Sequence, residues 1–243
     1  MNLTILLTIS NTFGAVACFT GIIGLLARKG SGIHRVVGRI FFISLLGVVG
    51  AEIWVNLHAN EFTMFLVALL SGYFGISGYR CLYLNRSMGR YFVFASRPGV
   101  LDKGLAQLNI IICLALSFWA GINLQDIEGF LKNVSKAFEI TTLLTLSLLG
   151  LVISYNDIRR FRAANIVERD WLRRHSIRMI ISFVGVGILV LENNFVGVPE
   201  IVRWLLPVAL GIPLMVFWCC RITRWMKNDS RITEFVNLTD KFK

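Results

Sequence analysis

Charged residues are scarce in this chain, and acidic residues are the scarcest of them. Only 16% of the 243 residues are charged and 14 are Asp or Glu, whereas 56% are hydrophobic. Soluble domains carry about 25% charged residues, so this composition excludes an ordinary soluble protein. A spanning helix uses about 20 residues plus a connection, so about seven spans would use the whole chain. We therefore expect an all-α, polytopic membrane protein with a single seven-helix transmembrane domain over residues 1–225 and a basic cytoplasmic tail over residues 226–243.

The chain is also poor in the residues that bind metals. It has three histidines and five cysteines, and it contains no HExxH and no CxxC. These absences exclude zinc proteases and histidine-rich di-iron oxygenases, and they support neither a zinc site nor a disulfide framework. We predict no metal site. Two bis-histidine haems would need four ligands, so His34 and His175 allow at most one haem of the b type, which stays open as an alternative with the cofactor unknown.

Seven apolar runs are close to the length of a spanning helix. The N-terminal MNLTILLTISN lacks the positive charge of a signal peptide, so we expect it to be retained as the start of the first helix. The runs are Leu3–Ala27, Ile40–Leu57, Phe62–Ser77, Leu105–Ile122, Ile140–Tyr155, Ile177–Leu191 and Leu205–Cys220.

The basic residues alternate between the connections. The first, third and fifth connections and the C-terminal tail hold 22 of the 25 Lys and Arg residues. Cytoplasmic loops retain positive charge, so the pattern predicts an N-terminus outside and a C-terminus in the cytoplasm. The net charge of +11 is thereby explained by topology and by contact with anionic lipids, and a nucleic-acid partner is not expected.

Glycines recur at intervals of three in three of the runs, as in SGYFGISG at residues 71–78. Small residues on one helical face let helix backbones approach closely. We expect these helices to pack against one another, or against a protein partner or a second copy of the chain.

Polar residues interrupt two runs in their outer halves. Glu52 and Asn56 lie four residues apart and therefore on one face of the second helix, and Glu192 lies near the outer end of the sixth. Ionisable residues inside a membrane are costly and mark functional sites by default. We predict an outer pocket built from Glu52, Asn56 and Glu192, which would line the route of a small transporter or channel.

A second polar group is predicted at the cytoplasmic ends of the helices. IHRVVGR leads into the second helix as WLRRHSIRM leads into the sixth, and two acids lie at the same boundary. The acids would be structural ion-pair partners, or they would orient a histidine that acts as a base while the arginines hold a lipid phosphate. We predict that this cluster binds an anionic lipid headgroup or a small ligand, and whether the chain is an enzyme stays open. Its members are His34, Arg35, Arg39, Asp102, Asp157, His175 and Arg178.

Several different short motifs are distributed along nearly the whole chain. They include KG at Lys29, HR at His34, GR at Gly38, and the W-x-x-x-H-x-x-RM pattern from Trp171 to Met179. In order and spacing the chain resembles a bacterial family of predicted integral-membrane proteins of unknown function. The resemblance implies an all-helical protein of the bacterial inner membrane, and it implies no reaction or substrate.

Overall fold

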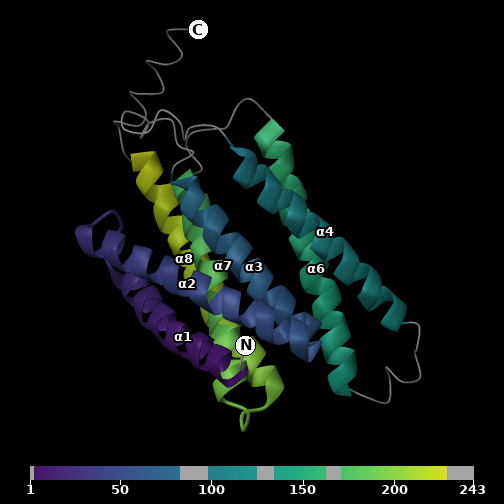
Figure 1. Ribbon diagram of the computed structural model, residues 1–243. Helices are drawn as coiled ribbons and strands as arrows, with labels where there is room; N and C mark the ends of the chain where they lie inside the picture. The colour runs from purple at the N-terminus through teal and green to yellow at the C-terminus, as the bar shows by residue number, and fades with distance from the viewer. Residues whose placement is uncertain (1–2, 83–97, 125–133, 163–170, 229–243) are drawn as a thin grey trace.

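The computed structural model describes residues 3–82, 98–124, 134–162 and 171–228 (Figure 1). In these ranges the regular structure is entirely helical, and each of the seven helices is long and apolar enough to cross a membrane. The all-helical architecture and the number of candidate spans are thus as predicted. The helices are α1 (Leu3–Leu26), α2 (Gly32–Ala59), α3 (Phe62–Cys81), α4 (Val100–Asn123), α6 (Val134–Arg162), α7 (Trp171–Asn194) and α8 (Glu200–Asn228).

Several helices extend beyond the apolar runs that predict them. Helix α2 begins at Gly32, because the Ser31 side chain accepts a hydrogen bond from the His34 backbone N–H at 3.2 Å and caps the helix. Gly30 has a φ of 80°, a conformation that glycine adopts readily, and it turns the chain between α1 and α2. His34 therefore lies on the first turn of a helix, and His175 likewise lies near the start of α7.

Helix α3 is the centre of the bundle. It packs against α2, α4, α6 and α7. Of the residues in its most apolar stretch 67% are buried, whereas the corresponding share is 17% in α1 and in α8. Helices α4 and α6 pair on one side of α3, while α1 and α2 pair on the other (Figure 1). The remaining helix, α8, packs on α7. The apolar outer faces of α1 and α8 are thus left for lipid.

The glycines of α3 mark its closest approaches to its neighbours. A Cβ added at Gly75 would lie 2.1 Å from Leu45 of α2, and one at Gly78 would lie 2.9 Å from the Cβ of Arg178 of α7. The predicted close packing is therefore found within the chain itself. Gly50 is different, since no atom lies within 4 Å of a Cβ placed there.

The two ends of the bundle differ in charge. We call the end where α1 ends and α2 begins the basic end, and the end where α2 ends at Ala59 the acidic end. Among the described cations, only Lys136 and Arg203 lie on helix segments at the acidic end. The charge alternation of the sequence is thus reproduced by the arrangement of the helices.

The last helix is longer than the sequence predicts. It is continuous through Pro207 and Pro213. It continues past the predicted domain boundary to Asn228, and the basic tail beyond it lies outside the described residues.

Candidate functional site

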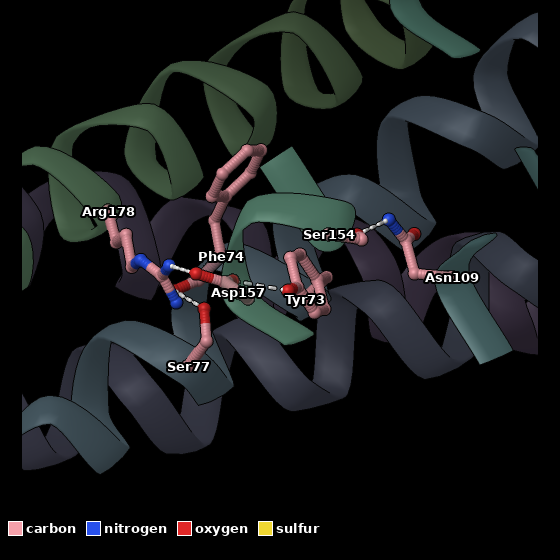
Figure 2. A network of polar contacts seen from close by, with 7 residues as sticks. All are labelled: Tyr73, Phe74, Ser77, Asn109, Ser154, Asp157 and Arg178. Carbon is pink, nitrogen blue, oxygen red and sulfur yellow. Dashed lines mark hydrogen bonds and ion pairs between the residues drawn. The ribbon is translucent and has the colours of Figure 1, made fainter. Parts of the chain in front are cut away.

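A buried ion pair links α3, α6 and α7 at the basic end (Figure 2). Asp157 accepts hydrogen bonds from the guanidinium of Arg178 and, at 2.5 Å, from the Tyr73 hydroxyl. Asp157 is only 3% exposed and Arg178 only 9%. A carboxylate and a guanidinium at this depth satisfy each other, so neither offers a free charge to a ligand.

The same region of the core holds a neutral polar pair. Asn109 of α4 donates a hydrogen bond to the Ser154 hydroxyl of α6 at 2.7 Å, and both residues are buried (Figure 2). This bond fixes the contact between α4 and α6 beside Asp157. It is a structural contact that the sequence did not indicate.

Asp102 is also committed to an arginine. Its carboxylate accepts two hydrogen bonds from Arg80, at 2.9 and 2.6 Å, and one from the Gly99 backbone N–H at 2.9 Å. The last of these caps the N-terminus of α4. Both acids of the predicted cluster are therefore structural partners, and neither bonds to a histidine.

Two of the predicted arginines lie outside the cluster. Arg35 and Arg39 are exposed on α2, whereas His34 and His175 are half-buried. The structure therefore divides the seven predicted residues into two exposed cations, two acids in ion pairs, the arginine that pairs with Asp157, and the two histidines.

The two histidines share one geometry. The Nδ1 atom of His34 lies 3.0 Å from the Gly24 carbonyl of α1, and the Nδ1 atom of His175 lies 2.9 Å from the Gly78 carbonyl of α3. A carbonyl oxygen only accepts, so Nδ1 carries the proton in both rings and Nε2 is left available. The histidines do not hydrogen-bond to each other, but His34 is close enough to act electrostatically on His175.

Lys29 lies beside the histidine pair, although the sequence analysis used this residue only to orient the chain in the membrane. Its ammonium donates to the Gly24 carbonyl at 2.8 Å, the same carbonyl that His34 contacts, and lies 4.1 Å from the ring centroid of Trp218. It also acts electrostatically on His175. Among the described residues no carboxylate pairs with Lys29. Burial lowers the pKa of Lys29 from its ordinary 10.5 to about 8.

The outer pocket is only partly as predicted. Glu52 is 1% exposed, and its carboxylate accepts hydrogen bonds from Asn56 at 2.9 Å, Asn193 at 2.6 Å and the Ser10 hydroxyl. Glu192 instead forms an ion pair with Arg203 at 2.9 Å. The pocket is thus built on Glu52 and Asn56 with Ser10 and Asn193, and Glu192 belongs to a separate pair.

Among the described residues, no three His, Cys, Asp or Glu side chains gather in a way that could hold a metal ion. Comparison with protein-family models, curated proteins and solved structures finds no match to this chain.

Proposed function

We propose that this chain is a multi-span protein of the bacterial cytoplasmic membrane that binds the phosphate of an anionic lipid at its basic end. The site consists of Lys29, His34 and His175. We assign the basic end to the cytoplasm because positively charged connections are retained there, which puts the N-terminus outside and the C-terminal tail inside. The resemblance to a bacterial membrane family agrees with this location and stays a prediction.

The observation that carries the proposal is the charge of Lys29, which no carboxylate among the described residues neutralises. The arginines and acids of the predicted cluster are instead exposed or paired, as in the Arg178–Asp157 pair. Lys29 is half-buried, and its bonds go to the backbone carbonyls of Gly24 and Leu25. A buried cation without an anion is costly, so a phosphate beside it would supply the missing partner.

The histidines suit the same ligand. Their Nδ1 atoms are held by carbonyls, so each ring is oriented and a proton taken up at Nε2 would make it a second donor to phosphate. The cytoplasmic leaflet carries anionic lipids at the depth of these helix ends. A shallow hollow of about 300 Å³ on α8, lined by Phe217, Cys220, Arg221 and Arg224, adjoins Trp218 in sequence and presents apolar and cationic groups together.

Lipid retention by the purified protein tests the proposal. Native mass spectrometry compares adducts of phosphatidylglycerol with adducts of phosphatidylcholine carrying the same acyl chains, and a third arm adds inorganic phosphate as a competitor. We expect selective retention of phosphatidylglycerol. Displacement by inorganic phosphate would identify a free anion as the ligand.

Three variants separate the site from general basic charge. Lys29→Met removes the uncompensated cation and should weaken retention about tenfold, since a hydrogen bond to a charged group contributes about 1.5 kcal/mol or more. The double variant His34→Ala with His175→Ala should abolish retention while membrane insertion is kept. Arg39→Ala removes an exposed cation from the same helix as His34 and serves as the matched control, with retention unchanged. Equal retention by all variants, or a double variant that fails to fold, contradicts the proposal.

A single b-type haem is the second candidate function. A ligating histidine typically donates its other ring N–H to a carbonyl or carboxylate, and His34 and His175 both do so. Their Nε2 atoms would be the groups that hold the haem iron. An absorption spectrum of the protein purified from haem-supplemented cells, with and without the double histidine substitution, decides this candidate by the presence or loss of a Soret band.

A further inference from the structure

The buried carboxylate of Glu52 has no cationic partner among the described residues. It is 1% exposed in the interior of a bundle whose helices are apolar enough to span a membrane. The other described ion pairs of the core join each acid to an arginine, as Glu192 is joined to Arg203 at 2.9 Å. Among the described residues, Glu52 receives hydrogen bonds only from neutral groups, namely Ser10, Asn56 and Asn193. The carboxyl group is therefore surrounded by dipoles, and no described cation lies against it.

The ligands around Glu52 come from three helices. Ser10 belongs to α1, Asn56 lies one helical turn beyond Glu52 on α2, and Asn193 belongs to α7. Each carries an oxygen as well as a hydrogen-bond donor. Turning the Asn193 amide by 180° would present its Oδ1 to the site with no movement of the chain, and rotating the Ser10 hydroxyl would present Oγ. Asn56 stays a donor, because its Nδ2 also donates to the Glu52 backbone carbonyl at 2.8 Å. The set can therefore hold either an ionised carboxylate or a cation bound to it.

The site lies near the acidic end of the bundle. Asn193 is on the last turn of α7 and is half-buried, which makes it the least buried of the three residues that bond to Glu52. The next residue, Asn194, is exposed and donates a hydrogen bond to the half-buried Asn11 at 3.0 Å. A species that enters from the acidic end would therefore meet Asn193 first.

The other titratable groups at this end do not occupy the site. His58 contacts the Trp54 carbonyl through Nδ1 at 2.8 Å, and Glu192 pairs with Arg203. Glu61, at the start of α3, is exposed. None of these residues forms a hydrogen bond with Glu52, and no described cation does. No described residue therefore supplies a counter-charge to this carboxylate.

From this geometry we propose that Glu52, with Ser10, Asn56 and Asn193, is a membrane-embedded site that binds and releases a monovalent cation, either a proton or Na⁺, from the acidic end. This gives the chain a second site, distinct from the proposed phosphate site at the basic end. The two sites share no residue, so either proposal can fail while the other stands.

Labelling with dicyclohexylcarbodiimide tests the proposal on the full chain. This apolar reagent modifies protonated carboxyl groups within a membrane, and the adduct is located by peptide mass spectrometry. We expect one adduct at Glu52 in the parent, which increases from mildly alkaline to mildly acidic buffer. Glu52→Gln should remove this adduct. Glu192→Gln is the matched control, since it removes a carboxylate that an arginine already neutralises, and the Glu52 adduct should remain.

A comparison of two salts identifies the cation. Labelling in NaCl is compared with labelling in choline chloride at equal ionic strength. Protection by Na⁺ alone identifies Na⁺ as the occupant, whereas a dependence on pH without protection by Na⁺ identifies the proton.

A second variant keeps the carboxylate in place. Asn193→Ala removes one hydrogen bond to the carboxylate, and labelling at a given pH in the range where it is partial should rise about tenfold. Absence of an adduct at Glu52 under every condition, or an adduct that responds to neither pH nor Na⁺, overturns the proposal.

Discussion

Replacing Asp157 with Asn should destabilise the bundle strongly, because it removes the charge that neutralises Arg178. The substitution keeps the size of the side chain and an oxygen that can accept from the Tyr73 hydroxyl, which lies 2.5 Å away. What changes is the charge opposite a guanidinium that is only 9% exposed. The experiment therefore isolates the ion pair from the packing around it.

The expected magnitude follows from the burial of both partners. Removing one member of a buried ion pair costs about 3–5 kcal/mol, because the other charge is left without a partner. Removing both charges, with Asp157→Asn and Arg178→Met together, should cost less than the sum of the single variants by at least about 1 kcal/mol. Asp102→Asn is the comparison, since its partner Arg80 has a side chain that is 28% exposed. A more exposed pair contributes only about 1 kcal/mol or less.

The assay is unfolding of the purified protein in mixed micelles with increasing dodecyl sulfate, followed by tryptophan fluorescence. An Asp157→Asn variant that unfolds within about 1 kcal/mol of the parent would refute the structural role of the pair. If that variant also lost lipid retention, Asp157 would belong to the binding site, and the interpretation of the acid as an ion-pair partner would be wrong.

Three further predictions concern the ligand, the packing and the orientation. Retention of phosphatidylglycerol should fall as the pH rises through about 8, because Lys29 is protonated below this pKa and neutral above it. The inflection should vanish in the residual retention of Lys29→Met. Gly185→Ala should cost about 1–3 kcal/mol, since the added Cβ would lie 1.9 Å from the Ser71 hydroxyl, whereas Gly121→Ala meets no atom within 4 Å and should be neutral or slightly stabilising. A thiol reagent that cannot cross membranes should label Asn60→Cys in intact cells, and Ser31→Cys only after permeabilisation, both in a background without the native cysteines.

The sequence was sufficient to predict the helices. A segment that spans a membrane must satisfy its backbone hydrogen bonds internally and present apolar side chains, so each helix appears as a long apolar run. It was insufficient for the contacts between helices. Asn56 could be assigned to the face of Glu52 from its spacing of four residues, but Ser10 and Asn193 come from other helices and no periodicity indicates them. Adjacent residues on a helix point about 100° apart, so Glu192 and Asn193 could not be expected to serve one pocket.

The candidate site at the basic end shows a different limit of sequence reasoning. The positive charge of the connections is explained by the orientation of the chain in the membrane, so Lys29 was not predicted to be a binding residue. Lys29 differs from exposed cations such as Arg35 in being half-buried, with its ammonium held against the Gly24 carbonyl and the Trp218 ring. That difference depends on which helices are neighbours, which charge counting does not give. For Asp102 and Asp157 the opposite holds. The sequence analysis predicted both as ligand-binding residues, whereas in the fold each forms an ion pair with an arginine.

Lys29 and Glu52 carry groups of opposite sign that form no ion pair with a described residue, and they lie toward opposite ends of the bundle. In the proposed orientation Lys29 faces the leaflet that carries anionic lipids, while Glu52 opens toward the outside, from which an inside-negative potential drives cations inward. Each unpaired charge then faces a source of its counter-charge. The reverse orientation would place Lys29 at the outer leaflet and would have the potential draw cations away from Glu52. If Asn60→Cys were labelled only after permeabilisation, the lipid proposal would therefore lose its source of anions, whereas the Glu52 site would remain able to bind a cation from the cytoplasm.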